Sequence, residues 1–323
     1  MANIILTGSE GFLGTRLREL WGDQDKIIGV DIAGSPDYYV DLCDLKEFAK
    51  IVEFASPELV IHLGAYSHVI RSDLQPEKSA LEILGLNVLS TYNVLQATLT
   101  ECPVIIAGSA QEYGSWPEGI SPPTENDPSH PEEPYGLSKY IGSLFVADRL
   151  WQKATILRFS NLYGPKQRNK FIPMVIENAL TGKPLVLHGK GRQTRQFLYV
   201  DDAVAAIRAS VNDARWRNSY NITHPEEVPI RTAAVIVYSE LQNAALRTGR
   251  DLPLVDLKLQ EGGGGASRVC MDPSLAMREL GWQPKISLEE GIRRTVNVAL
   301  ENKYAYTSLE YYSRRVGTGA TNF

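Results

Sequence analysis

Short apolar runs alternate with stretches of helical periodicity through the first half of the chain, and this alternation limits the possible folds more than any other sequence feature. Between the runs, residues 81–99 carry apolar side chains every three to four residues. Continuous apolar strands separated by helices predict a parallel sheet covered on both faces. Because crossovers between parallel strands are nearly always right-handed, the sequence predicts a doubly wound α/β (Rossmann) fold. The apolar runs are Ile4–Leu6, Ile27–Asp31, Leu59–Leu63, Val104–Ala107 and Ile156–Arg158.

Composition and charge exclude several classes of partner. The net charge is −5 and lysine and arginine form no long run, so we expect no nucleic-acid partner. Three widely spaced cysteines and five histidines without ligand spacing predict neither a disulfide framework nor a metal site. No segment is apolar enough to span a bilayer, and residues 3–7 resemble a first strand rather than a signal peptide. We therefore expect no membrane partner and a cytoplasmic location.

A glycine-rich turn follows the first apolar run. Gly8, Gly11 and Gly14 would allow backbone N–H groups to approach a pyrophosphate at a helix N-terminus. Asp31 ends the second apolar run, where a carboxylate bonds the adenosine ribose in dinucleotide-binding folds. Each feature alone also fits an ordinary turn. No cation directly follows Asp31 to receive a 2′-phosphate, so the pair favours NAD over NADP.

Tyr135 and Lys139 are four residues apart, which places them on one face if the segment is helical. A free phenol has a pKa near 10, and a neighbouring ammonium group favours the phenolate. The spacing therefore predicts a tyrosine base, although a solvated helix face would have the same pattern.

Several further motifs resemble one enzyme family. Together with the glycine turn and the Tyr–Lys pair, they make the chain similar over nearly its whole length to extended short-chain dehydrogenases/reductases of the NAD-dependent epimerase/dehydratase family. The motifs are Asp41-Leu42, His62-Leu63-Gly64-Ala65, Asn87 to Thr91, Gly108 to Gly114, Arg158 to Pro165 and Gln193 to Asp202.

The resemblance implies a role for each matching residue. Tyr135 would be the general base and acid, Lys139 would tune it, and Ser109 would bond the sugar hydroxyl that is oxidised. The implied cofactor-binding residues are Gly8, Gly11, Phe12, Leu13, Gly14, Asp31, Asp41, Leu42, Leu63, Ala65, Asn87, Ala107, Tyr135, Lys139 and Phe159.

The substrate side is implied by the same resemblance. Arg195 would bind a diphosphate, unless it forms a surface ion pair with Asp201 or Asp202. The family commonly has an arginine in a loop that here reads Glu261–Gly265, and Arg268 is a candidate replacement. The implied substrate-binding residues are Ser109, Gln111, Asn161, Arg195 and Arg268.

Turn-forming residues become frequent after about Gly164, which predicts a second, smaller lobe. We expect an NAD-binding domain at 1–165 plus about 192–224, and a substrate-binding lobe at 166–191 and 225–323. A homodimer is a further expectation from the family.

The implied reaction is 4-epimerisation of a nucleotide sugar through a transient 4-keto intermediate. The family's 4,6-dehydratases carry an Asp-Glu pair after the catalytic Ser or Thr, where this chain has Ala110 and Gln111. Glu112 would face the other side if the strand continues, although a local bulge could reverse this. A 4-ketosugar reductase using NAD(P)H, a dehydratase and a non-catalytic NAD-binding regulator stay open as alternatives.

Overall fold

The computed structural model describes residues 2–22, 25–66, 79–98, 102–147, 153–211, 216, 219–253, 255–263 and 267–301. At their centre lies a seven-stranded sheet in the order β11-β6-β5-β4-β1-β2-β3, and every pair of neighbouring strands is parallel. The strands are β1 (Asn3–Thr7), β2 (Lys26–Asp31), β3 (Tyr38–Tyr39), β4 (Leu59–His62), β5 (Val104–Ser109), β6 (Ala154–Phe159) and β11 (Ser219–Ile222). The predicted doubly wound parallel sheet is confirmed.

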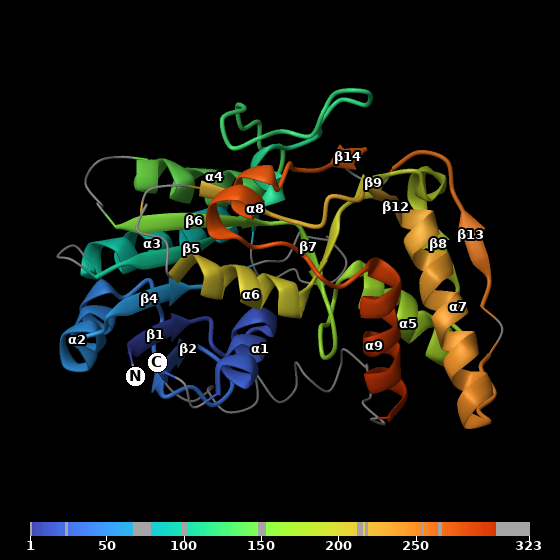
Figure 1. The fold of residues 1–323 in the computed structure, drawn as a ribbon, viewed down its shortest axis with the longest axis horizontal. Coiled ribbons are helices and arrows are strands. Elements are labelled where there is room, and N and C mark those ends of the chain that lie inside the picture. Colours follow the sequence, from blue (N-terminus) through green and yellow to red (C-terminus); the bar gives the residue numbers. More distant parts are fainter. Residues whose placement is uncertain are drawn as a thin grey trace.

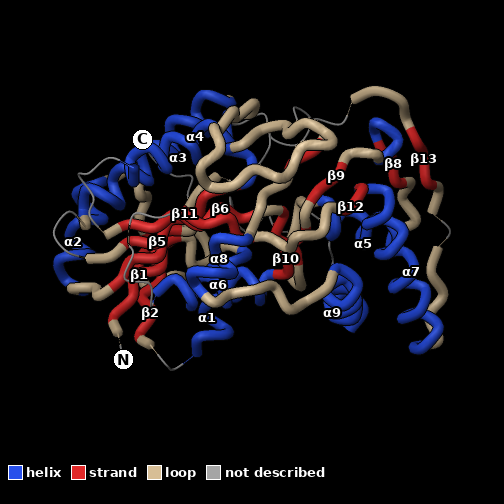
Figure 2. The backbone as a smooth tube through the Cα atoms, turned by 45° about the horizontal axis from the view of Figure 1, so that its top comes forward, coloured by secondary structure: helices blue, strands red, loops and turns tan. Residues whose placement is uncertain are grey.

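Helices cover both faces of this sheet, as Figures 1 and 2 show. Side chains alternate along each strand, so Ile4 and Leu6 pack towards α1 and α6 while Ile5 packs towards α2 and α3. Both faces are therefore apolar, which explains why the strands appear as continuous apolar runs in the sequence. The covering helices are α1 (Phe12–Trp21), α2 (Leu45–Ala55), α3 (Ala80–Ala97), α4 (Pro134–Ala147) and α6 (Val200–Val211).

A second apolar cluster lies beside the sheet, around the helices grouped at the right of Figure 1. Its helices are α5 (Phe171–Thr181), α7 (Ile230–Thr248) and α9 (Leu288–Glu301), and the strands with them are β8 (Leu185–Leu187) and β13 (Leu257–Leu259). Short strands connect this cluster to the sheet: β7 (Asn161–Tyr163), β9 (Thr194–Arg195), β10 (Phe197–Tyr199), β12 (Val228–Pro229) and β14 (Arg268–Val269).

Helix α8 (Ser274–Leu280) does not follow the expected division of the chain. It belongs by sequence to the predicted second lobe, yet Ala276 packs in the apolar cluster of the sheet, beside α6 and β11. The domain limits stay a prediction. No helix in the described ranges has the length and apolar content of a membrane span.

The connections create one switch point in the sheet. From β1 the chain builds outward to β2 and β3, and then returns to place β4 on the other side of β1. In such sheets, ligands bind outside the carboxyl ends of the strands at this reversal. The glycine turn after β1 and the segment after β4 both lie there.

Candidate active site

The turn between β1 and α1 has no room for a side chain at Gly8 or Gly14. A Cβ atom on Gly14 would lie 2.2 Å from the carbonyl oxygen of Gly8, and one on Gly8 would lie 2.6 Å from the amide nitrogen of Gly64. Helix α1 has no side-chain cap at Gly11, so its first N–H groups point outward from the helix end. Within the described chain, the Ser9 hydroxyl is buried without a hydrogen-bond partner. These features fit a dinucleotide pyrophosphate.

Asp31 is held firmly at the end of β2. Its carboxylate accepts hydrogen bonds from the backbone N–H groups of Glu10 (3.0 Å), Ile32 (2.7 Å) and Ala33 (3.2 Å). Arg18 reaches the same corner from α1, where it pairs with Glu10 at 3.0 Å and Asp37 at 3.5 Å. The sequence prediction missed this cation because it considered only the residues after Asp31.

Replacing Asp31 tests the predicted preference for NAD. In Asp31→Ser, we expect the ratio of NADP to NAD affinity to rise about tenfold, equivalent to about 1.4 kcal/mol, because a carboxylate no longer repels the 2′-phosphate. Isothermal titration with each nucleotide measures this ratio. Asp256→Ser changes an exposed aspartate directly before β13 and serves as the control. An unchanged ratio in Asp31→Ser would contradict the prediction.

Asn87, one of the predicted cofactor-binding residues, is engaged within the protein. Its side-chain amide accepts from the N–H of Tyr66 (2.8 Å) and donates to the Tyr66 carbonyl (3.1 Å) and to Ser138 (3.1 Å). Asn87 therefore ties the segment after β4 to α4, and a direct contact with the cofactor stays a prediction. Leu42 is buried beside Gly64, where a Cβ atom would lie 3.0 Å from its Cδ1. A side chain at position 64 would therefore press on Leu42.

The three predicted catalytic residues lie together. Ser109 ends β5, Tyr135 occupies the first turn of α4, and their side chains are hydrogen-bonded. The Lys139 Nζ atom lies 5.9 Å from the centre of the Tyr135 ring and donates to the Ala107 carbonyl at 2.9 Å. A Cβ atom on Gly136 would lie 2.4 Å from the Gln111 carbonyl oxygen, so this glycine permits α4 to approach the end of β5.

Burial dominates the ionisation of this pair. It raises the pKa of the Tyr135 phenol to about 12; the Glu112 carboxylate also raises it, and the hydrogen bond with Ser109 lowers it. Burial lowers the pKa of Lys139 to about 8, and Glu112 opposes that shift. The sequence spacing indicates the ammonium group next to the phenol, but it does not indicate this desolvation.

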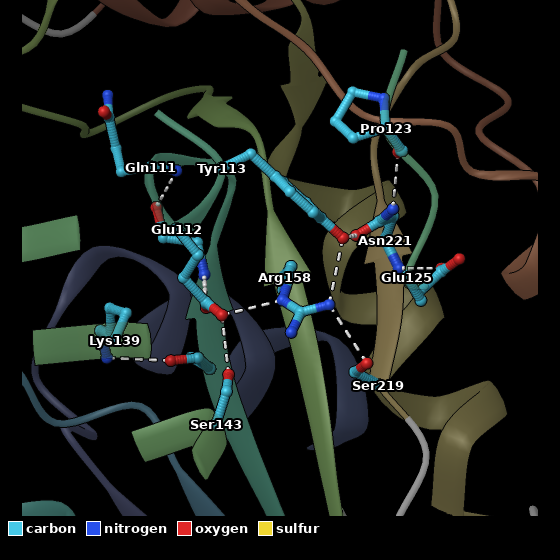
Figure 3. A network of polar contacts seen from close by, with 12 residues as sticks. Gln111, Glu112, Tyr113, Pro123, Glu125, Lys139, Ser143, Arg158, Ser219 and Asn221 are labelled. Carbon is cyan, nitrogen blue, oxygen red and sulfur yellow. Dashed lines mark hydrogen bonds and ion pairs between the residues drawn. The ribbon is translucent and has the colours of Figure 1, made fainter. Parts of the chain in front are cut away.

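Glu112 does not continue the strand. The chain turns after Ser109 into a short 3-10 helix, η2 (Ala110–Glu112), and the Glu112 carboxylate turns back to accept the Ser109 N–H at 2.9 Å. Figure 3 shows this carboxylate between Arg158 (2.8 Å) and Ser143 (2.7 Å). The side chain is fully buried. The strand therefore does not continue to Glu112, so the condition under which this side chain would face the other side is not met.

The predicted substrate residues are more dispersed. Asn161 donates to the Gln196 carbonyl at 3.1 Å, and Arg195 donates to the Thr194 carbonyl at 2.7 Å. Asp201, the suggested surface partner of Arg195, instead pairs with Arg16. Burial lowers the pKa of Arg195.

Arg268 is engaged within the protein. Its guanidinium forms two bonds to Glu227 (2.7 and 2.5 Å) and donates to the carbonyls of Pro117 (2.5 Å) and Ile120 (2.7 Å). The backbone N–H of Trp116 in turn donates to the Arg268 carbonyl at 2.8 Å. Arg268 thus fastens the loop that leads from η2 towards α4, and its suggested replacement of the family's phosphate-binding arginine stays a prediction. Gly264 and Gly265 of the glycine-rich loop lie outside the described residues.

The comparison with protein families identifies this arrangement. The NAD dependent epimerase/dehydratase family model matches residues 4–223. The chain belongs to this family. It is therefore an enzyme of the extended short-chain dehydrogenase/reductase type, and the cofactor of the family is NAD.

Relatives within the family carry out different reactions. A dTDP-glucose 4,6-dehydratase from Haemophilus influenzae is 31% identical, over 94% of this chain and 99% of its own length. Among solved structures, a UDP-glucose 4-epimerase from Thermotoga maritima with UDP-glucose has a TM-score of 0.81 at 25% identity, covering 93% of this chain and 99% of that one. A dTDP-glucose 4,6-dehydratase from Streptomyces venezuelae with NAD bound has a TM-score of 0.80 at 27% identity, covering 93% and 97%.

Proposed function

We propose that this member of the family is a nucleotide-sugar 4-epimerase. It would oxidise the C4 hydroxyl of a nucleotide-linked sugar to a ketone and reduce that ketone from the other face. The observation that carries the proposal is the cluster of Ser109, Tyr135 and Lys139, together with the neutral side chains of Ala110 and Gln111 beside it.

Each residue of the cluster has a chemical task in this scheme. The Tyr135 oxygen takes the proton of the C4 hydroxyl and returns it when the ketone is reduced. Ser109 bonds the same sugar oxygen and orients it, and the Lys139 ammonium stabilises the phenolate. Bound NAD would accept the hydride and return it. The substrate gains and loses the same hydride and proton, so the cycle needs no external reductant.

The residues around the glycine turn would hold the cofactor. The N-terminus of α1 would face the pyrophosphate, Asp31 the adenosine ribose, and Lys139 the nicotinamide ribose. Asn161 and Arg195 are proposed to bind the substrate diphosphate. The expected homodimer and cytoplasmic location belong to the same proposal.

A 4,6-dehydratase is the second candidate, favoured by the identity of 31% to the Haemophilus influenzae enzyme. Dehydration also requires groups that move protons at C5 and C6 of the sugar. In the family these are acidic residues at the positions of Ala110 and Gln111, neither of which titrates. Glu112 is the nearest carboxylate in sequence, but its oxygens already bond Ser109, Ser143 and Arg158.

Mass spectrometry separates these candidates. We expect incubation with dTDP-glucose or UDP-glucose to give a product of unchanged mass, whose inverted C4 is visible by NMR. A product lighter by one water would instead establish the dehydratase. Turnover that requires added NADH or NADPH and a 4-keto sugar would indicate the reductase. Either of the last two results would contradict the epimerase proposal.

A further inference from the structure

The carboxylate of Glu112 connects three elements of the active site. It accepts the N–H of Ser109 at the end of β5, the hydroxyl of Ser143 on α4 and the Nε–H of Arg158 on β6. Ser143 lies four residues after Lys139 and eight after Tyr135, so all three share one side of the helix. Figure 3 shows Glu112 between these elements.

The backbone leaves space for this carboxylate. A Cβ atom on Gly108 would lie 2.7 Å from the Glu112 Oε1 atom. The ion pair with Arg158 is almost completely buried, with side-chain exposures of 0% and 8%. Desolvation makes such a pair no more stabilising, in general, than well-packed apolar side chains of similar volume. Stability alone therefore does not account for a charged pair at this position.

Arg158 extends the network to the far side of the site. Its Nη1 atom donates to the Tyr113 hydroxyl and to Ser219, each at 3.1 Å. The Tyr113 hydroxyl donates to Asn221 Oδ1 at 3.0 Å, and the Asn221 amide donates to the Pro123 carbonyl at 3.2 Å. Pro123 lies in the loop that leads to Tyr135. The network therefore joins Ser109 to the start and the middle of the segment between η2 and α4.

We propose that the buried Glu112–Arg158 ion pair positions the catalytic groups, by holding Ser109 and the Tyr135–Lys139 side of α4 in a fixed relation. Glu112 and Arg158 are then positioning residues that do not touch the substrate. The proposal rests on the proposed function only in assigning catalysis to Ser109, Tyr135 and Lys139. The geometry itself does not depend on which sugar is bound.

The charge of Glu112 gives this role a measurable signature. The charged or titratable groups around it are Arg158 on β6, Tyr135 and Lys139 on α4, Tyr113 after η2 and Glu125 in the following loop. Glu112 raises the pKa of both Tyr135 and Lys139. Removing its charge therefore lowers both pKa values. Lys139 and Tyr135 then each lose their proton at a lower pH than in the wild type.

The double variant Glu112→Gln/Arg158→Met tests the proposal without leaving one buried charge unpaired. NMR of ¹³Cε-labelled lysine, assigned with Lys139→Met, measures the Lys139 pKa without any substrate. We expect this pKa to fall, because Glu112 raises the Lys139 pKa and Arg158 is not among the groups that shift it. The control Arg16→Met/Asp201→Asn removes an ion pair between α1 and α6, and its Lys139 pKa should equal that of the wild type.

Kinetics then test positioning. We expect kcat of the double variant to fall about tenfold or more, because small displacements of catalytic groups are costly, while KM is unchanged. The acidic limb of the kcat–pH profile should move to lower pH. A purely structural pair would reduce only the fraction of folded enzyme and leave kcat per folded molecule unchanged, which would overturn the proposal. An inactive wild type would instead contradict the proposed function, and the lysine titration would still show whether the Glu112 charge acts on Lys139.

Ser143→Ala gives a second test if the double variant does not fold. It removes only the 2.7 Å bond between α4 and Glu112. We expect a several-fold fall in kcat with unchanged KM, and a melting temperature within a few degrees of the wild type. Unchanged kcat would overturn the proposed connection between Glu112 and α4.

Discussion

Tyr135→Phe is expected to lower the rate of sugar oxidation by roughly 10²–10⁴-fold, the usual contribution of a positioned acid–base group. The variant keeps the ring that packs beside Lys139 and loses only the oxygen that bonds Ser109. Binding of NAD and of the nucleotide sugar should change little. The measurement is the absorbance change of the bound nicotinamide after rapid mixing with substrate.

Tyr140→Phe is the matched control, since it removes one hydroxyl from the same helix five residues later. Its rate should equal that of the wild type. If Tyr135→Phe retained near-full turnover, the proposed chemistry would be wrong for every reaction in the family that begins with this oxidation. The same variant also tests the pH dependence, because the acidic limb assigned to the phenol should disappear from any residual activity.

Gly14→Ala is expected to weaken NAD binding strongly, because the new methyl group would lie 2.2 Å from the Gly8 carbonyl oxygen. Overpacking typically costs about 1–3 kcal/mol. If that strain falls on the glycine turn, affinity should fall by roughly 5- to 150-fold. Isothermal titration with NAD provides the measurement, and the melting temperature shows how much of the strain the fold absorbs.

Gly85→Ala is the control for this substitution. Gly85 also lies inside a helix, α3, but a Cβ atom there meets nothing within 4 Å. Replacement by alanine should therefore raise stability by about 0.5–1 kcal/mol and leave NAD affinity unchanged. Equal NAD affinity in both variants would show that the close approach of Gly14 to Gly8 does not shape the cofactor site.

Local patterns in the sequence were sufficient to predict the large elements. The apolar run Ile27–Asp31 corresponds to β2, and the periodic stretch 81–99 corresponds to α3 at Ala80–Ala97. The two-residue strands β3, β12 and β14 carry no comparable signal, because partners far along the chain determine them. The burial of Tyr135 likewise depends on several elements at once. The four-residue spacing therefore indicates that the Lys139 charge lies near the phenol, but it does not indicate that both groups are desolvated.

Glu112 shows a signal that was present but not used. A serine followed three residues later by glutamate is typical of a capping box, and Ser109 and Glu112 have this spacing. This pattern predicts a turn after Ser109 and so decides against a strand that continues to Glu112. The engagement of Arg268 by Glu227 had no such signal, because 41 residues separate them.

The contact between Arg268 and the loop before Tyr135 has a consequence for how the chain folds while it is being synthesised on the ribosome. Arg268 contacts Pro117 across 151 residues of sequence. At about 5–20 residues per second, synthesis of that interval takes roughly 8–30 s. Five central strands of the sheet, β1, β2, β4, β5 and β6, have been synthesised long before Arg268 appears. The nascent chain can therefore begin to assemble the central sheet and its glycine turn before Arg268 is available to hold the loop beside the catalytic residues.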